Sequence, residues 1–443
     1  MHRPDLIIRS RHAVLPGGTR AAAVVISGPV ISAIEDYDAR IDALADADLG
    51  ELALLPGLVD THVHVNEPGR TEWEGFATAT RAAAAGGVTT ICDMPLNSLP
   101  PTVSLAALRD KRAAAAGQCH VDVGFWGGAV PGNQDELAAM HAAGVVGFKC
   151  FLLDSGNSEF APLDQNGLRS ALTVIAGLGA QLMVHAEDGA EISAVSGGDY
   201  GSFVASRPPK AERRAIEKVI SAAAATGGRA HIAHLSAAEC AAMIAGAKAA
   251  GIALTAETCP HYLFFAAEQV PEGGTEYKCC PPIRDAINRE ALWRALEAGV
   301  IDAVVSDHSP CPAAMKASGD FGEAWGGIAS LQLSLAAVWT IARRRGRSLD
   351  DIARWMSAAP AALAGLPGKG AIEPGRDADL VAFDPDDTFI VDGSRLLHRQ
   401  PVTPYNGEKL TGSVRQVWLR GKEITSQTGP SGRLLTRGEP ARG

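Results

Sequence analysis

The feature that most limits how this chain can fold is a regular alternation of strand-like and helical segments along its middle. The segment LPGLVDTHVHV leads into an expected helix near residues 72–86, and VTTICDMP leads into another near 103–117. Counting from the first of these gives eight strand–helix units. Strands that alternate with helices form parallel βα units, and eight such units are typical of a closed barrel. We therefore predict an α/β protein with a (β/α)8 TIM barrel over residues 56–372.

The two ends of the chain differ from this middle. Residues 1–55 contain short β-branched stretches broken by Pro-Gly-Gly and Gly-Pro. Residues 373–443 contain similar stretches, such as ADLVAFD and TFIVDG, separated by turn residues. We predict that residues 1–55 and 373–443 are the N-terminal and C-terminal parts of one small β-sandwich.

The composition excludes several other classes of protein. Apolar residues make up 47% of the chain and charged residues 20%, which is typical of a soluble globular enzyme. The net charge of −10 is spread without blocks, which disfavours nucleic acid and anionic membranes as partners. No segment is long and apolar enough to span a bilayer. The first ten residues lack an apolar leader, so we expect a cytoplasmic protein.

Residues able to bind a metal stand where the predicted strands end, which is the face that carries chemistry in a parallel barrel. His62 and His64 are two residues apart, so their side chains point the same way and can hold one ion together. Asp307 ends an apolar strand, where a carboxylate needs a cation, although a salt bridge would also satisfy it. The full set is His62, His64, Lys149, His185, His234 and Asp307.

The remaining histidines are sorted by the same alternation. His231 and His234 are three residues apart, so only one of them can face the mouth of the barrel. We favour His234 because it is nearer the end of its strand. His308 follows Asp307 directly and should face away from the ion, and His261 stays ambiguous.

Lys149 is the unusual member of the set. An ammonium group has no lone pair and would repel a metal. A buried lysine loses its proton more easily than an exposed one, and the neutral amine can take up carbon dioxide to form a carbamate that bridges two metals. A lysine that reaches the surface is the alternative. Nitrogen and oxygen ligands of this kind suit two divalent ions about 3.5–4 Å apart, such as zinc, cobalt, nickel or manganese.

At this point the sequence resembles the cyclic amidohydrolases, and within them the allantoinase family. The resemblance runs from DLIIRS to VRQVWLRGKEI and is carried by the motifs PGLVDTHVHVNEPGRTEWEG, GFKCFL, HAED, HIAHLS and SDHSPC. It implies that the six residues above are the ligands of two divalent ions per subunit, with zinc as the first choice, and that Lys149 is N6-carboxylysine. It further implies that Asp307 is the catalytic base and acid.

The same resemblance guides the prediction of substrate contacts. Dihydroorotases carry Arg at the position of Asn66, where it binds a carboxylate, whereas an amide suits a neutral ureido group. Leu96 is inserted relative to the dihydroorotase pattern and is followed by Asn97, the second expected contact. Hydantoinases carry Tyr at the position of Asp154, so the oxyanion contacts stay open. The family also uses backbone groups near Pro282 and Gly327.

The resulting hypothesis is a hydrolase that opens the ring of allantoin to give allantoate, and by resemblance a homotetramer. A hydantoinase or dihydropyrimidinase type of ring-opening enzyme is the nearer alternative. A non-catalytic assembly protein built on the same barrel is the more distant one.

Overall fold

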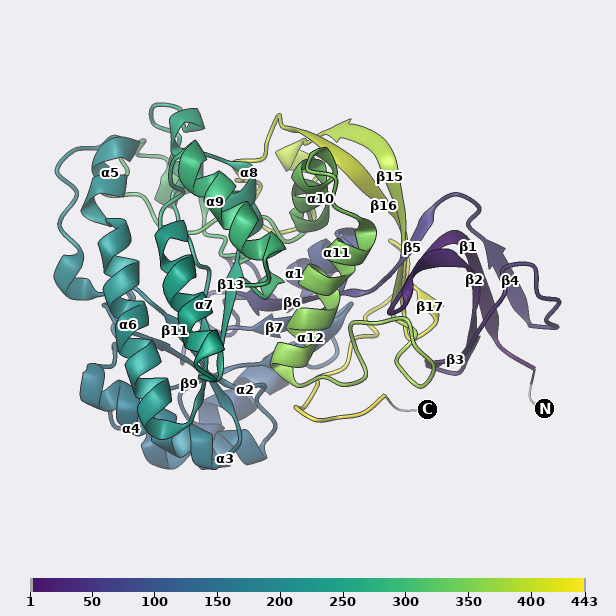
Figure 1. Cartoon of the computed structure of the whole chain (residues 1–443), viewed down its shortest axis with the longest axis horizontal. Coiled ribbons are helices and arrows are strands. Elements are labelled where there is room, and N and C mark those ends of the chain that lie inside the picture. The colour runs from purple at the N-terminus through teal and green to yellow at the C-terminus, as the bar shows by residue number, and fades with distance from the viewer. Residues whose placement is uncertain (1–2, 442–443) are drawn as a thin grey trace.

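The computed structural model describes residues 3–441, and Figure 1 shows a sheet at one end of the molecule beside a body of helices and parallel strands. The sheet is mixed and has eight strands, in the order β17-β16-β15-β5-β1-β2-β3, with β4 paired to β1. These strands are β1 (Leu6–Leu15), β2 (Gly18–Ser27), β3 (Val30–Glu35), β4 (Ala45–Asp48), β5 (Ala53–Pro56), β15 (Leu380–Ile390), β16 (Lys409–Leu419) and β17 (Lys422–Glu423).

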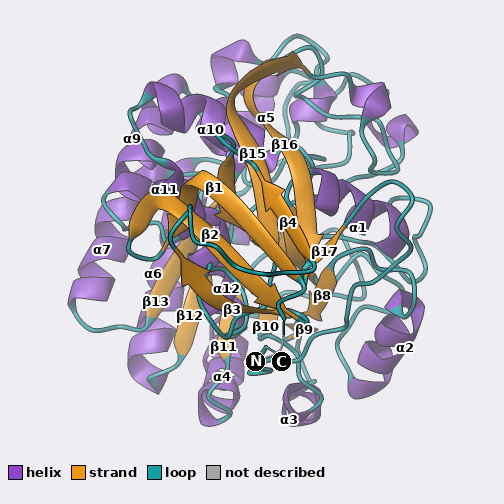
Figure 2. Ribbon diagram, turned by 90° about the vertical axis from the view of Figure 1, so that its right-hand side faces the viewer, coloured by secondary structure: helices purple, strands orange, loops and turns teal. Residues whose placement is uncertain are grey.

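The two ends of the chain meet in this sheet through β5 and β15. These strands are antiparallel, and Leu55 pairs with Val381. Buried β-branched residues favour strands in this sheet, as Val24, Val25 and Ile26 of β2 show. Both ends of the chain contribute strands to this one continuous hydrogen-bonded sheet, which faces the viewer in Figure 2.

The body contains parallel strands in two sheets, β6-β7-β8 and β9-β10-β11-β12-β13-β14. Their bounds are β6 (Leu58–Val63), β7 (Val88–Asp93), β8 (Asp122–Phe125), β9 (Gly127–Gly128), β10 (Phe148–Phe151), β11 (Gln181–His185), β12 (Arg229–Ile232), β13 (Leu254–Thr258) and β14 (Ala303–Val304). The edges of the two sheets also meet. On one side the Val146 N–H donates to the Phe125 carbonyl (2.9 Å), and on the other the His64 N–H donates to the His308 carbonyl (2.8 Å).

Helices surround these strands in both views. They are α1 (Phe76–Ala85), α2 (Leu105–Ala115), α3 (Gln134–Ala142), α4 (Gln165–Gly177), α5 (Tyr200–Ser206), α6 (Pro209–Thr226), α7 (Ala241–Ala249), α8 (Pro260–Phe264), α9 (Ala286–Glu297), α10 (Ser334–Arg344), α11 (Leu349–Ala353) and α12 (Ala359–Ala364). Helix α4 illustrates why they form. Asp164 caps its first turn by accepting the Gly167 N–H, and the helix buries Leu168, Leu172 and Ile175, which share one face.

The chain beyond β17 leaves the sheet and returns to the body. The Gly432 N–H donates to the Cys119 carbonyl and the Leu435 N–H to the Val123 carbonyl, both at 2.8 Å. Leu434 thereby pairs with Val123 beside β8. Among the described residues, no helix is both long and apolar enough to cross a membrane.

Candidate metal centre and active site

The ends of five parallel strands bring the six predicted ligands to one cavity. His62 lies in β6 and His64 directly follows it, whereas Lys149 and His185 lie in β10 and β11. His234 and Asp307 follow β12 and β14 by two and three residues. All six line the same cavity and all are buried.

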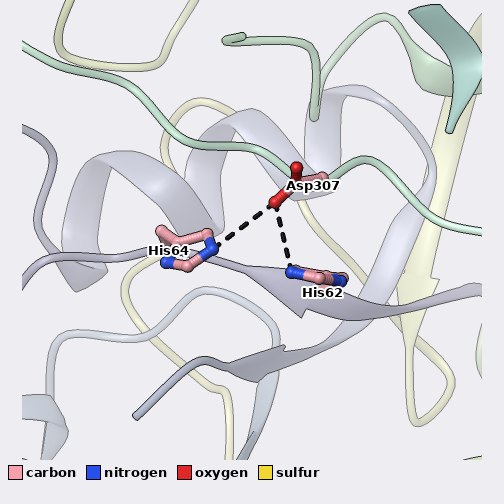
Figure 3. A group of neighbouring side chains, drawn as sticks. All are labelled: His62, His64 and Asp307. Atoms are coloured by element: carbon pink, nitrogen blue, oxygen red, sulfur yellow. Dashed lines mark ion pairs between the residues drawn. The ribbon is translucent and has the colours of Figure 1, made fainter. Parts of the chain in front are cut away.

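Distances within the cluster show that its polar atoms converge. Oδ1 of Asp307 lies 3.2 Å from Nε2 of His62 and 3.4 Å from Nε2 of His64, as Figure 3 shows. Nζ of Lys149 lies 3.5 Å from Nε2 of His62. The ring of His234 is centred 4.5 Å from the ring of His185 and 5.3 Å from that of His62.

Two buried glutamates orient the histidine rings. Glu257, in β13, bonds Nδ1 of His62 with one oxygen and Nε2 of His231 with the other (2.9 Å), which leaves Nε2 of His62 facing Asp307. Glu187 bonds Nε2 of His185 (2.8 Å) and leaves Nδ1 of that ring for another partner. Carboxylates in this position are typical of metal-binding histidines because they fix the ring and its tautomer.

Charges in the cluster also suit a cation. Burial lowers the pKa values of His62, His185 and His234, which favours the neutral imidazole that binds metals. Burial opposes the ionisation of Asp307, but the neighbouring His62 and His64 hold its pKa at about 2. Burial lowers the pKa of Lys149 to about 8.

The donor set therefore fits divalent metal ions of the zinc type. It offers imidazole nitrogens and a carboxylate oxygen without a thiolate. His234 adds direct support, because its buried Nδ1 has no hydrogen-bond partner within residues 3–441.

The backbone of the site lies in an unusual conformation. Asn66 (φ 67°), Asn97 (φ 69°), His234 (φ 33°) and Asp307 (φ 45°) are left-handed, and the described chain has only one other such non-glycine residue, Arg420. This conformation is costly for residues with a side chain and is concentrated at functional sites.

The structure brings two of the four predicted substrate contacts to the cavity. Asn97 lines it, with Nδ2 3.4 Å from Nδ1 of His64. Gly327 also lines it, and a Cβ at this position would lie 2.3 Å from the Ser309 carbonyl oxygen, so no larger residue fits.

The other two predicted contacts, Asn66 and Pro282, form hydrogen bonds with other groups of this chain. Asn66 is buried outside the cavity lining, and its Nδ2 donates to the Pro310 carbonyl (3.3 Å). The Pro282 carbonyl accepts the Ser236 hydroxyl (2.6 Å) and is likewise outside the lining. Asp154, at the hydantoinase Tyr position, lines the cavity and is otherwise exposed.

Sequence reasoning missed Glu257, Glu187, Arg207 and Trp325, of which the last two line the cavity. A signal existed for the two glutamates. Glu257 is an acid near the end of a predicted strand, as Asp307 is, and Glu187 stands two residues after His185.

Comparison with known proteins agrees with this geometry. The amidohydrolase family matches residues 53–424. The allantoinase of Streptomyces avermitilis is 54% identical over 440 residues, which cover 98% of this chain and 99% of that protein. The allantoinase of Arabidopsis thaliana is 42% identical over 94% of this chain and 87% of its own. The solved L-hydantoinase from Arthrobacter aurescens covers 98% of this chain and 100% of its own, with a TM-score of 0.94 and 31% identity.

The chain therefore belongs to the amidohydrolase family, a class of metal-dependent hydrolases. Within that family, its curated relatives place it with the allantoinases.

Proposed function

We propose that this chain is a cyclic amidohydrolase that opens the ring of allantoin to give allantoate. The observation that carries the proposal is the convergence of His62, His64 and Asp307 on one point of a cavity that Asn97 also lines. The sequence likeness to allantoinases over nearly the whole chain supports the choice of substrate.

The proposed cofactor is a pair of divalent ions, with zinc as the first choice. His62, His64, His185, His234 and Asp307 would hold the ions, and Lys149, as a carbamate, would bridge them. When bound, such ions supply a Lewis acid for the ring carbonyl and an activated water. The lowered pKa of Lys149 supports the carbamate, because only the neutral amine takes up carbon dioxide.

Asp307 is the proposed proton carrier. Its pKa of about 2 keeps it ionised at neutral pH, so it can accept a proton from the attacking water. It would return this proton to the ring nitrogen as the carbon–nitrogen bond breaks, and the product would leave as a carboxylate with release of one proton. Asn97 and the backbone at Gly327 would orient the ring, whereas Asn66 and Pro282 have weaker support because protein groups occupy part of their bonding capacity.

The same proposal includes the finer architecture. The contacts between the edges of the two parallel sheets support a closed (β/α)8 barrel over residues 56–372. Residues 1–55 and 373–443 would form the small β-sandwich beside it. The family resemblance adds a homotetramer, which light scattering of the purified protein tests.

A substrate panel tests the function. Purified protein loaded with zinc and bicarbonate should open allantoin with a kcat/KM well above those for hydantoin, dihydrouracil and dihydroorotate. Elemental analysis should give two metals per chain. Failure to open allantoin in a protein that holds both metals would overturn the proposal.

A hydantoinase is the second candidate, favoured by the TM-score of 0.94 with the L-hydantoinase. Asp154 at the Tyr position argues against it, because a carboxylate cannot donate to an oxyanion at neutral pH. Faster turnover of hydantoin than of allantoin in the same panel would favour this candidate.

A further inference from the structure

Arg207 is a cation in the wall of the cavity that the mechanism above does not use. It follows α5 and precedes α6, and its side chain is only 15% exposed. The part that remains exposed faces the cavity that the metal ligands line. A largely buried guanidinium needs hydrogen-bond acceptors, because leaving its buried donors unpaired is costly.

The protein gives the Arg207 guanidinium one acceptor. Nη1 lies 3.2 Å from Oε2 of Glu187, the same oxygen that bonds His185. A guanidinium carries five N–H donors in a fixed plane, and in residues 3–441 no other side-chain hydrogen bond of Arg207 is formed. Nε and Nη2 are not among the fully buried atoms that lack a partner, so these donors keep some exposure in a residue that lines the cavity.

Packing fixes the segment of backbone from which the Arg207 side chain extends. The hydroxyl of Tyr200, at the start of α5, donates to the Ile283 carbonyl (2.7 Å). The rings of Tyr200 and Phe203 pack against Phe321 with centroids 5.0 and 6.2 Å away. The Arg207 N–H closes the end of α5 on the Val204 carbonyl (3.1 Å). Donors fixed in this way bind a ligand without first having to be ordered.

The charge balance indicates the kind of acceptor. Glu187 already compensates the positive charge of Arg207, so the pair has no net charge left to attract a further carboxylate. A neutral carbonyl oxygen can accept hydrogen bonds from the remaining donors and leaves the pair neutral. The ring of allantoin carries such an oxygen on its ureido substituent.

We propose that Arg207 binds the carbonyl oxygen of the substrate's exocyclic ureido group and so selects ureido-substituted rings over unsubstituted ones. This inference rests on the proposed function, and it names Arg207 as the residue that recognises the ureido substituent. Glu187 would then hold the substrate-binding Arg207 and the metal ligand His185 with one carboxylate oxygen.

The test compares Arg207→Lys, which keeps the positive charge but removes the planar fork, with a matched control. Arg284→Lys is that control, because Arg284 makes a similar buried pair with Glu212 (2.7 Å) and lies outside the cavity lining. The measurements are kcat/KM for allantoin, the inhibition constant of hydantoin against allantoin turnover, and metal content.

For Arg207→Lys we expect kcat/KM for allantoin to fall about 10- to 100-fold. The inhibition constant of hydantoin, which lacks the ureido group, should change less than about threefold. The metal content of Arg207→Lys should match that of the wild type. In Arg284→Lys, kcat/KM for allantoin and the inhibition constant of hydantoin should keep their wild-type proportion.

Three results would overturn the inference: an unchanged kcat/KM for allantoin, an equal loss of affinity for hydantoin, or a loss of metal in Arg207→Lys. Wild-type protein that holds metal but does not open allantoin would instead refute the proposed function, so the two failures are distinguishable.

Discussion

Lys149 and Lys369 are two of the buried lysines in the described chain, and their surroundings differ in an instructive way. Lys149 lies among the histidines of the cavity and is 1% exposed, whereas Lys369 lies beside Asp122, the first residue of β8, and is 4% exposed. Nζ of Lys369 is within 2.8 Å of three carboxylates, those of Asp122, Asp377 and Asp379. These carboxylates outweigh burial and raise the pKa of Lys369, whereas burial lowers the pKa of Lys149 to about 8.

The comparison teaches how to tell a metal site from a salt bridge. Asp122, Asp377 and Asp379 are close enough together to hold a cation, just as His62, His64 and Asp307 are. At the base of the strands the chain supplies that cation itself, as the ammonium of Lys369 and the guanidinium of Arg420. In the cavity, burial lowers the pKa of the neighbouring lysine to about 8, and no ammonium or guanidinium within the described residues pairs with Asp307 as Lys369 does with its three acids. Ligand spacing alone therefore does not distinguish the two kinds of cluster.

The largest expected effect is on enzymatic activity, which should depend on Lys149 and not on Lys369. Lys149→Ala should abolish ring opening and lower the metal content, because the proposed ions would lose their proposed bridging ligand. Short carboxylic acids should restore part of both by filling the gap. Activity assays and elemental analysis check this. An active Lys149→Ala protein that holds two metals without added acid would contradict the proposed carbamate.

The next effect in size compares two acids, Asp307, which lies three residues after β14, and Asp122, which begins β8. Asp307→Asn keeps the shape of the side chain but removes its ability to carry a proton, and should lower kcat by about 10²–10⁴-fold. KM should change much less. If kcat stays within a factor of a few of the wild-type value, Asp307 is not the proton carrier. Asp122→Asn, at the base, should leave kcat per folded molecule unchanged.

Lys369 should affect stability and not chemistry. Lys369→Met leaves three buried carboxylates without their ammonium and should lower the free energy of unfolding by about 3–5 kcal/mol. Urea denaturation measures this loss. Metal content and kcat per folded molecule should match the wild type, and a loss of metal would show that the two clusters are not independent.

The smallest expected effect is a shift in the pH at which zinc reactivates the metal-free protein. Because the pKa of Lys149 is lowered to about 8 from 10.5, its neutral amine becomes abundant at much lower pH than that of a free lysine. Reactivation of metal-free protein by zinc at constant dissolved carbon dioxide should therefore speed up as pH rises through about 8 and then level off. A midpoint near 10.5 would mean that Lys149 is not buried as described.

Much of the site follows from local spacing. The two-residue period of a strand predicts that His62 and His64 face one way, and the position of His234 at a strand end predicts its preference over His231. The structure places His62, His64 and His234 in the cavity lining, whereas His231 is bonded to Thr255 and Glu257. Such placements are accessible from sequence because side-chain direction on a strand depends on neighbours in the sequence.

Features that depend on contacts between distant segments were harder to predict. Whether Asn66 and Pro282 reach the cavity depends on Pro310 and Ser236, which lie far away in the sequence. The sequence predicts the stretches ADLVAFD and TFIVDG as separate strands with turn residues between them. They form the single strand β15, and a shift in register between Asp384 and Thr388 accommodates the intervening residues.

The base of the strands has a consequence for how the molecule is made. Asp122 is synthesised 247 residues before Lys369, 298 before Arg420 and 311 before Arg433, whose N–H it also binds. At about 5–20 residues per second, a ribosome takes roughly 10–60 s to deliver these partners. During that time the nascent β8 has neither its counter-ions nor the returning segment at residues 432–435. The early strands can collapse while the chain is still being translated. The ion pairs and hydrogen bonds at the start of β8 are complete only after residues 432–435 have left the exit tunnel.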